Sequence, residues 1–167
     1  VDTARLIHPK VEAEIAFVMR DALAGPGCDI AKVLAATDYV VPAIELIDSR
    51  YENFRFDLPS VIADNTSASR YVLGSRPTAV QGLDLETLGV VMEKNGQVVE
   101  VGAGAAVLGN PAEAVAMLVN MLGERGQALP AGSVVLSGAI TAAVAVAAGD
   151  NVLVRADGIG STSMRFV

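Results

Sequence analysis

The run from Val11 to Met19 constrains this chain most, because it sets two carboxylates inside an otherwise apolar segment. Apolar residues recur with a period of two, so Glu12 and Glu14 project from one face of a predicted strand. Their Cα atoms would lie roughly 6.5 Å apart, within reach of one small object. One interpretation is a half-solvated strand whose outer face carries two glutamates. The same face turns apolar again at Ala16 and Val18, which favours a pocket floor with a cation between the acids.

Composition narrows the class of protein. The chain has 167 residues, 52% of them hydrophobic, which suffices for one domain with a substantial core. Its net charge is −7 and no stretch of Lys or Arg forms a basic patch, so we expect no nucleic-acid partner. The longest apolar run, around 139–148, is too short for a membrane span, so we expect no membrane partner. The single cysteine, Cys28, excludes an internal disulfide and fits a reducing compartment, which predicts a cytoplasmic location.

A third acidic residue, Glu45, stands in a second apolar run at 39–48, with apolar neighbours on both sides. A lone glutamate on a buried strand needs a partner. With Glu12 and Glu14 it makes three carboxylates on predicted buried strands, without a matching cluster of lysines. A hard divalent cation, Mg²⁺ or Mn²⁺, is the natural counterion for such an all-oxygen site. Three protein ligands would leave about three positions for water and a chelating substrate, whose carbonyl the ion would polarise.

Two other features of the sequence leave alternatives open. His8 is the only histidine, which excludes a multi-histidine metal site and makes a Ser-His-Asp triad hard to build. It either approaches the pocket or has a merely structural or exposed role. Gly102 and Gly104 invite comparison with the dinucleotide-binding glycine pattern, but position 107 is Val107. A turn or a substrate-facing backbone is therefore the favoured interpretation of these glycines.

Three helices are predicted, two of them from capping signals. Asp29 stands in an N-cap position before residues 30–36, and a short helix at 58–63 would present Asp64 and Asn65 at its C-terminal end. The longest helix begins at Asn110 and Pro111 and should end by Gly123 or Gly126. The residues that it should turn toward the core are Val115, Leu118, Val119 and Leu122. We also expect Met117 and Met121 to fill gaps in the core.

Strands are expected to outnumber helices. The clearest prediction is a hairpin at 88–101 around Asn95 and Gly96, and further strands are predicted at 11–19, 39–48, 133–138, 151–156 and 163–167. Pro42 should place its strand at an edge or at a bulge, because proline lacks an N–H. The expected fold is α+β: a β-rich, mixed and largely antiparallel sheet that curls or packs on itself, with a few flanking helices.

Several runs of the sequence resemble one known family. They are 8–15 (HPKVEAEI), 45–50 (ELIDSR), 63–65 (ADN), 102–109 (GAGAAVLG) and the glycine turn after Ser137. These runs are similar to the fumarylacetoacetate hydrolase superfamily, and within it to the hydratase and decarboxylase branch. The runs 49–58 and 136–146 look closer to a decarboxylase than to a hydratase. The resemblance covers essentially the whole chain.

The resemblance implies a metal-dependent decarboxylase of the meta-cleavage pathway of aromatic degradation. Its dicarboxylate substrate would be 2-oxo-3-hexenedioate, and its products 2-hydroxypenta-2,4-dienoate and CO₂. In the family, an E-x-E motif and a later acidic residue hold Mg²⁺ or Mn²⁺, and these fall on Glu12, Glu14 and Glu45. The family also implies a homo-oligomer and a complex with the hydratase of the same pathway.

Other site residues are second-tier assignments within this resemblance. Asp48 is a candidate for orienting a water on the metal, and Arg50 and Ser67 for positioning carboxylate and carbonyl groups as catalytic residues. The candidates for substrate binding are Asn65, Ser137, Gly138 and Thr141. Each of these could equally serve as a structural cap or turn residue.

The chain begins with Val1 rather than Met, directly before the predicted acidic strand. We therefore expect residues 1–167 to be a single catalytic domain from a processed, truncated or longer protein. Members of the resembled branch carry a preceding portion with a lysine-bearing stretch thought to contribute to the active site, and that portion is absent here. The fragment's own activity is an open question at this stage.

Three alternatives to the decarboxylase remain open. The sister activity is hydration of 2-hydroxypenta-2,4-dienoate. A C–C bond hydrolase of acylpyruvates is further away, because it would need a base to activate water and His8 is the only histidine. The non-enzyme alternative is a metal-binding or subunit-contact fragment.

Overall fold

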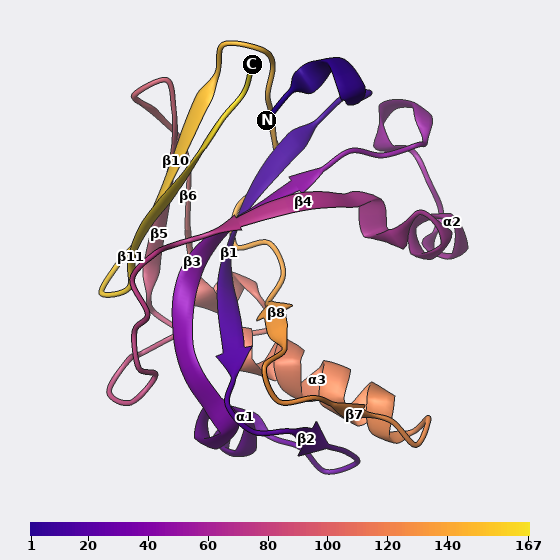
Figure 1. Cartoon of the computed structure of the whole chain (residues 1–167), viewed down its shortest axis with the longest axis vertical. Helices are drawn as coiled ribbons and strands as arrows, with labels where there is room; N and C mark the ends of the chain where they lie inside the picture. The colour runs from indigo at the N-terminus through magenta and orange to yellow at the C-terminus, as the bar shows by residue number, and fades with distance from the viewer.

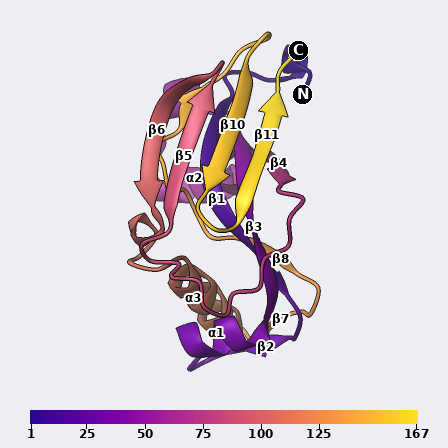
Figure 2. The same ribbon diagram turned by 90° about the vertical axis from the view of Figure 1, so that its left-hand side faces the viewer.

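The computed structural model describes residues 1–167, which form two antiparallel sheets packed face to face (Figures 1 and 2). The first sheet has the order β4 (Ala68–Leu73), β3 (Thr37–Ile47), β1 (Lys10–Met19), β8 (Val134–Leu136), and β9 (Val144–Ala145) also pairs with β1. The second has the order β11 (Gly160–Arg165), β10 (Asn151–Ala156), β5 (Gly89–Lys94), β6 (Gln97–Ala103). A small third sheet joins β2 (Leu23–Ala24) to β7 (Ala128–Leu129). The expected α+β fold with an antiparallel sheet that packs on itself is confirmed.

The main core lies between the two large sheets. Alternate residues of β1, which are Val11, Ala13, Ile15 and Phe17, are fully buried together with Val152 and Val154 of β10. Figure 2 shows the four-stranded sheet lying across β1 and β3. Because side chains alternate along a strand, the residues between these core positions point to the opposite face of β1. Glu12 and Glu14 lie on that opposite face.

Three helices flank the sheets, as predicted. They are α1 (Ile30–Ala36), α2 (Leu58–Ala63) and α3 (Pro111–Gly123), and the two expected from capping signals are α1 and α3. Asp29 accepts a hydrogen bond from the Lys32 N–H at 2.8 Å, and Asn110 accepts one from the Ala112 N–H at 3.0 Å. Figure 1 shows α1 and α3 together at one end of the molecule, near β2 and β7, and α2 beyond the end of β4.

The prediction that two methionines of α3 fill the core is wrong. Met117 and Met121 are 49% and 47% exposed, whereas Val115 and Val119 are fully buried. Val115 and Val119 are four residues apart and share one face of the helix. Met117 is two residues from each of them, which is about 200° around the helix axis. The core face is set by the valines, and the methionines lie on the other side.

The interpretation of Pro42 as an edge or bulge residue is also wrong. Its strand, β3, lies between β4 and β1, and the irregularity of the β3–β4 pairing falls between Leu46 and Ile47. Pro42 stands at the point where the β4 ladder ends, and its carbonyl accepts a hydrogen bond from the Gly74 N–H at 2.8 Å. Any side chain at Gly74 would place its Cβ 2.8 Å from the proline ring. The pair Pro42 and Gly74 therefore terminates the ladder inside the sheet.

The Asn95-Gly96 hairpin is confirmed as the connection between β5 and β6. Both turn residues have positive φ, 54° and 79°, which is the conformation that such two-residue hairpins require. Asn95 also accepts a hydrogen bond from the Asn151 N–H at 2.8 Å and donates one to Asp150 at 2.7 Å. The turn is thereby tied to the start of β10, which pairs with β5.

One stretch, Gly104–Gly123, is apolar and long enough by composition to cross a membrane, with a mean hydropathy of 1.4. The expectation that no stretch reaches this length is wrong on that criterion, because it considered only unbroken apolar runs. The structure divides the stretch into a 3-10 turn at Gly104–Ala106, a bend with positive φ at Leu108 and Gly109, and α3. The 13 residues of α3 extend only about 20 Å, compared with about 30 Å for a bilayer core.

Candidate metal centre

Three carboxylates meet on the face of β1 and β3 that is turned away from the second sheet. The antiparallel register sets Glu12 directly opposite Glu45, and Glu14 follows two residues along β1 on the same face. One carboxylate oxygen from each residue lies within 4.8 Å of the others. The strand periodicity brought Glu12 and Glu14 together, and the pairing of β1 with β3 adds Glu45.

On the side of Glu14, the cluster is surrounded by buried apolar residues. Glu14 is only 2% exposed, while Glu12 and Glu45 are half-buried. Beyond Glu14 the same face carries the buried residues Ala16, Val41 and Ala43, packed against further apolar side chains from β4 and β8. The cluster therefore lies between buried apolar residues on one side and the half-buried side chains of Glu12 and Glu45 on the other.

Burial governs the electrostatics of the three carboxyls. Burial is the main reason that the pKa of Glu14 is raised to about 8; the Gly138 N–H, which favours the charged form, opposes the rise, and the nearby Glu45 and Glu12 add to it. Burial and then the charge of Glu45 raise the pKa of Glu12, and Lys10 opposes this effect. Burial also raises the pKa of Glu45, partly offset by a hydrogen bond with Glu14.

The donor set fits a hard divalent cation. None of the ion pairs in the chain involves these three glutamates, so no lysine or arginine neutralises them at contact distance. Three acceptor-only oxygens that are desolvated and close together are destabilised unless a cation or protons lie between them. Mg²⁺ and Mn²⁺ prefer oxygen ligands of this kind, and three protein ligands leave coordination positions open.

The segment 137–141 lies along β1 beside the cluster. The Gly138 N–H donates a hydrogen bond of 2.7 Å to Glu14 Oε2, and the Ser137 N–H donates one of 3.0 Å to the Ile15 carbonyl. The Thr141 hydroxyl accepts a hydrogen bond from the Ala13 N–H at 3.3 Å. Gly138 has φ +104°, a conformation that favours glycine. Gly138 thus contacts the cluster directly, whereas the bonds of Thr141 and of the Ser137 N–H go to the backbone of β1.

Two of the candidate catalytic residues are held by Asp64, a buried carboxylate at the end of α2. Arg50 forms an ion pair with the Asp64 side chain and also donates to its carbonyl. The hydroxyls of Ser67 and Ser49 donate to Asp64 Oδ2 at 2.9 and 3.2 Å. Burial raises the pKa of Asp64, but the hydrogen bonds from Ser67 and Arg50 together outweigh it and hold that pKa below its usual value.

Asp48 and Asn65 occupy different places. Both oxygens of the Asp48 carboxylate accept backbone hydrogen bonds, from the Ile7 N–H at 2.9 and 3.0 Å and from the His8 N–H at 2.8 Å. Asn65 is exposed and lines a cavity of about 230 Å³ whose other walls are Glu45, Ala68, Ser69, Arg70 and Tyr71. Of these two residues, only Asn65 shares a cavity with a glutamate of the cluster.

Sequence reasoning missed two residues near the cluster. Asp64 organises Arg50 and Ser67 across 14 and three positions of the chain, and no local pattern signals such a contact. Lys10 has a usable signal, because it precedes Glu12 by two residues and so shares its face of β1. Its charge already acts on the Glu12 carboxyl.

The two glycines that suggested a nucleotide loop are packing positions. A Cβ at Gly104 would lie 1.8 Å from the Leu85 carbonyl oxygen, and one at Gly102 would lie 2.5 Å from the Ile140 carbonyl oxygen. Only glycine allows such a close approach of two backbones. A turn, which was one of the two favoured interpretations, is the one the structure has at Gly104.

The fold and the carboxylate cluster define a member of a known family. The profile of the fumarylacetoacetate (FAA) hydrolase C-terminal domain matches residues 4–167. The chain therefore belongs to the fumarylacetoacetate hydrolase family, as the sequence runs suggested.

Particular relatives narrow the comparison. The 4-oxalocrotonate decarboxylase of Pseudomonas sp. (strain CF600) is 64% identical over 167 residues, which are 100% of this chain and 63% of that protein. The 2-hydroxyhexa-2,4-dienoate hydratase of Comamonas testosteroni is 43% identical over 98% of this chain and 62% of its own length. The chain thus spans less than two thirds of the length of these curated relatives.

A solved structure agrees with this comparison. The 4-oxalocrotonate decarboxylase of Pseudomonas putida G7, in complex with magnesium and adipate, superposes with a TM-score of 0.96 and is 59% identical. The match covers 100% of this chain and 64% of that one. The arrangement of sheets and helices therefore matches the corresponding part of that enzyme.

Proposed function

We propose that the protein containing this chain decarboxylates 2-oxo-3-hexenedioate to 2-hydroxypenta-2,4-dienoate and CO₂, with Mg²⁺ or Mn²⁺ as cofactor. The observation that carries the proposal is the cluster of Glu12, Glu14 and Glu45, whose carboxylate oxygens lie within 4.8 Å of one another. Support comes from the 64% identity to a decarboxylase of this name and from the magnesium in the related solved structure.

The reaction breaks one C–C bond and moves one electron pair. The bond between C5 and the C6 carboxylate breaks, CO₂ leaves, and the electron pair passes through the conjugated chain to the 2-oxo oxygen. A proton taken up there gives the five-carbon dienoate, so all six carbons are accounted for. A bound divalent cation supplies Lewis-acid stabilisation for the negative charge that collects on this oxygen.

The residues of the chain prepare the site for this chemistry. Glu12, Glu14 and Glu45 in their charged forms hold the cation, and the Gly138 N–H fixes the orientation of Glu14. The apolar floor around Ala16 keeps water from one side, which strengthens every electrostatic interaction in the pocket. The negative charge that develops along the conjugated chain is thereby stabilised by fixed charges of the site and not by mobile water molecules.

The second-tier residues act in this proposal mainly by positioning. Asp64 holds Arg50 and Ser67 at the rim, and Asp48 fixes the backbone that enters β1 at His8. Asn65 contributes its amide to the cavity beside Glu45 and is our candidate for a direct substrate contact there. The residues of the 137–141 segment that we assign to the substrate-facing wall are Ser137, Gly138 and Thr141.

The test uses the full-length protein with Mg²⁺ or Mn²⁺ and 2-oxo-3-hexenedioate. We expect CO₂ release, which Glu12→Gln or Glu45→Gln reduces by at least two orders of magnitude because a ligand and its charge are lost. Glu124→Gln, at an exposed position after α3, is the matched control and should keep full activity. Full activity in both ligand variants would contradict the proposal.

The sister activity is distinguished by its substrate. Addition of water to 2-hydroxypenta-2,4-dienoate, without CO₂ release from 2-oxo-3-hexenedioate, would assign the protein to the hydratases. The 43% identity to a hydratase, against 64% to a decarboxylase, makes the hydratase the second candidate.

The assembly of the protein is part of the same proposal. In this proposal residues 1–167 act as one catalytic domain, and the test uses the full-length protein because the relatives are longer than this chain. The domain works in the cytoplasm within a homo-oligomer that associates with the hydratase of its pathway. Light scattering of the full-length protein, alone and mixed with that hydratase, tests both associations.

A further inference from the structure

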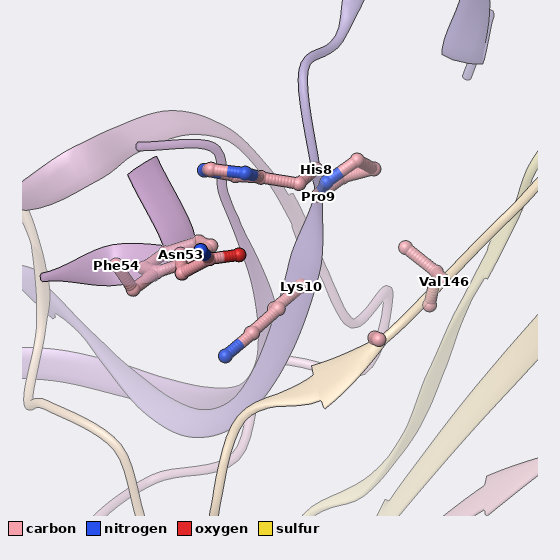
Figure 3. Close-up of a pocket in the computed structure, with 7 residues that line it drawn as sticks. His8, Pro9, Lys10, Asn53, Phe54 and Val146 are labelled. Carbon is pink, nitrogen blue, oxygen red and sulfur yellow. The ribbon is translucent and has the colours of Figure 1, made fainter. Parts of the chain in front are cut away.

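A second cavity, of about 330 Å³, lies beside the entry to β1 (Figure 3). It is lined by His8, Pro9, Lys10, Asn53, Phe54, Ala145 and Val146. The lining comes from the entry to β1, from the 3-10 turn Glu52–Phe54 and from β9 with the residue after it. None of the residues assigned to the proposed function lines this cavity.

The cavity adjoins the face of β1 that carries the glutamates, two residues before Glu12. Lys10 precedes Glu12 by two residues, so both side chains leave β1 on the same side, and their Cα atoms are separated by roughly 6.5 Å. On the neighbouring strand, Ile47 lies opposite Lys10 just as Glu45 lies opposite Glu12. A molecule held at the carboxylate cluster can therefore extend along β1 into this cavity.

The cavity has one full charge, and that charge is positive. Lys10 is the only Lys, Arg, Asp or Glu residue of the lining, and it takes part in none of the ion pairs of the chain. Its Nζ atom lies 4.4 Å from the centroid of the Phe54 ring, a cation–π contact that holds the ammonium in place without neutralising it. A lysine fixed in this way is available to an anion.

A second nitrogen in the cavity lacks a partner. His8 Nε2 is buried and makes no hydrogen bond, although the backbone N–H of the same residue is bonded to Asp48. The imidazole ring lies 4.7 Å from the Phe54 ring, centroid to centroid. Figure 3 shows the His8 ring and the Lys10 side chain extending from β1 to the same side, toward Phe54. A buried polar atom without a partner is costly unless a ligand satisfies it.

We propose that this cavity, the Lys10 subsite, binds the second carboxylate of a linear dicarboxylate whose first end is held at the glutamate cluster. The Lys10 ammonium pairs with the carboxylate, and the His8 imidazole donates a hydrogen bond to it from Nε2. The inference rests on the proposed function, because it takes the cluster to hold the 2-oxo end of the substrate.

The dimensions of a six-carbon diacid suit this assignment. Five carbon–carbon bonds of about 1.5 Å each, in a zigzag chain, separate the two carboxyl carbons by about 6 Å. This length is close to the step from Glu12 to Lys10 along β1. The subsite therefore selects dicarboxylates over monocarboxylates of the same length, and it is a determinant of specificity.

The experiment measures binding rather than turnover. Calorimetric titration of the Mn²⁺-loaded full-length protein uses adipate as the six-carbon diacid and hexanoate as its monocarboxylate counterpart. We expect Lys10→Met to weaken adipate about tenfold and to leave hexanoate unchanged, because methionine keeps the apolar contact with Phe54 but removes the charge. Lys10→Arg should restore most of the lost affinity, and His8→Leu should produce a smaller loss for adipate.

Controls separate this inference from the proposed function. Lys32→Met removes an exposed lysine of α1 and should change neither affinity. Mn²⁺ binding, followed by electron paramagnetic resonance, should not weaken in Lys10→Met and should be lost in Glu14→Gln. Should Lys10→Met fail to fold, His8→Leu still tests the subsite, because it should weaken adipate and leave hexanoate unchanged.

The outcomes are distinguishable. If Lys10→Met and His8→Leu bind Mn²⁺ and lose no affinity for adipate, or lose affinity for adipate and hexanoate equally, the Lys10 subsite is wrong and the proposed function stands. If the parent protein does not bind Mn²⁺, or Glu14→Gln binds it as tightly, the metal site and the proposed function fail.

Discussion

The protonation of Glu14 controls both the metal affinity and the stability of the domain. Burial brings the pKa of this carboxyl to about 8, so near neutral pH the metal-free site retains a proton that a cation must displace. The neighbouring carboxyls of Glu12 and Glu45 are also shifted upward. A site that is costly to ionise when empty is well suited to bind a divalent cation, because the cation relieves that cost.

The first prediction concerns metal affinity as a function of pH. Between pH 6 and about pH 8 the affinity for Mn²⁺ should rise, since fewer protons compete for the carboxyls, and it should level off above that range. Calorimetry in two buffers of different ionisation enthalpy measures the protons released on binding. Release should be largest at the low end of the range. A pH-independent affinity with no proton release would show that the glutamates are not the ligands.

The second prediction concerns the metal-free protein. A raised pKa in the folded state favours the protonated form, so the stabilising contribution of Glu14 is complete below the ordinary glutamate pKa of 4.5. It decreases as the pH rises and is lost above about pH 8. The free energy of unfolding in EDTA, measured by urea titration, should therefore fall by a few kcal/mol between pH 5 and pH 9.

Two comparisons check the origin of this pH dependence. Glu14→Gln should flatten it and should be more stable than the parent at pH 9 without metal, because the buried charge is gone. Saturating Mn²⁺ should stabilise the parent but not the variant. A steep pH dependence that persists in Glu14→Gln would assign the effect to other groups.

At the scale of elements, the sequence correctly predicted the ends of helices and strands wherever a single capping or turn residue determines them. Asp29 and Asn110 cap α1 and α3, and the Asn95-Gly96 turn joins β5 to β6, all as the sequence predicted. Pro42 was misjudged because the end of a ladder inside a sheet depends on where β4 stops, which is a property of the partner strand. Met117 and Met121 were misjudged because hydrophobicity alone does not identify the buried face.

In the candidate site, too, some residues were predictable from a local sequence pattern and others depend on tertiary contacts. Glu12 and Glu14 were readable from a period of two, and Glu45 from its apolar run, but the register that sets Glu45 opposite Glu12 is tertiary information. The Asp64 network and the Lys10 subsite depend on contacts of the segment 50–67 with itself and with β1. No pattern within a short window contains such contacts.

The third prediction concerns this segment, which Asp64 holds together. Asp64→Asn removes the charge that binds Arg50 and one acceptor of the Ser67 hydroxyl, so the segment should open more often. Trypsin should then cleave after the exposed Arg55 several-fold faster than in the parent protein. Asp38→Asn, at an exposed position at the start of β3, is the control and should not change the rate. Equal rates in all three proteins would mean that the Asp64 contacts do not restrain the segment.

At the scale of the whole molecule, the chain closes on itself at its termini. The Thr3 N–H donates to the Val167 carbonyl at 2.9 Å, and the Val167 N–H donates to the Val1 carbonyl at 2.8 Å. Figure 1 shows both ends side by side at one end of the molecule. Directly beside these bonds, Phe166 is fully buried in the core between the two sheets. The sheet that carries the glutamate cluster thus depends on the second sheet for the apolar cover of its other face.

The fourth prediction follows from that dependence. Phe166→Ala should lower the free energy of unfolding by about 3–5 kcal/mol, since it removes a large buried side chain and leaves a cavity that the paired termini cannot close. Phe56→Ala, at a side chain that is 39% exposed, is the matched control and should cost about 1 kcal/mol or less. Both values come from urea unfolding of the metal-free full-length protein. Because Phe166 lies on the far side of β1 and β3 from the glutamates, the folded variant should bind Mn²⁺ with unchanged affinity. A loss of metal affinity at temperatures where Phe166→Ala is fully folded would show that the second sheet also sets the geometry of the site, beyond supporting its fold.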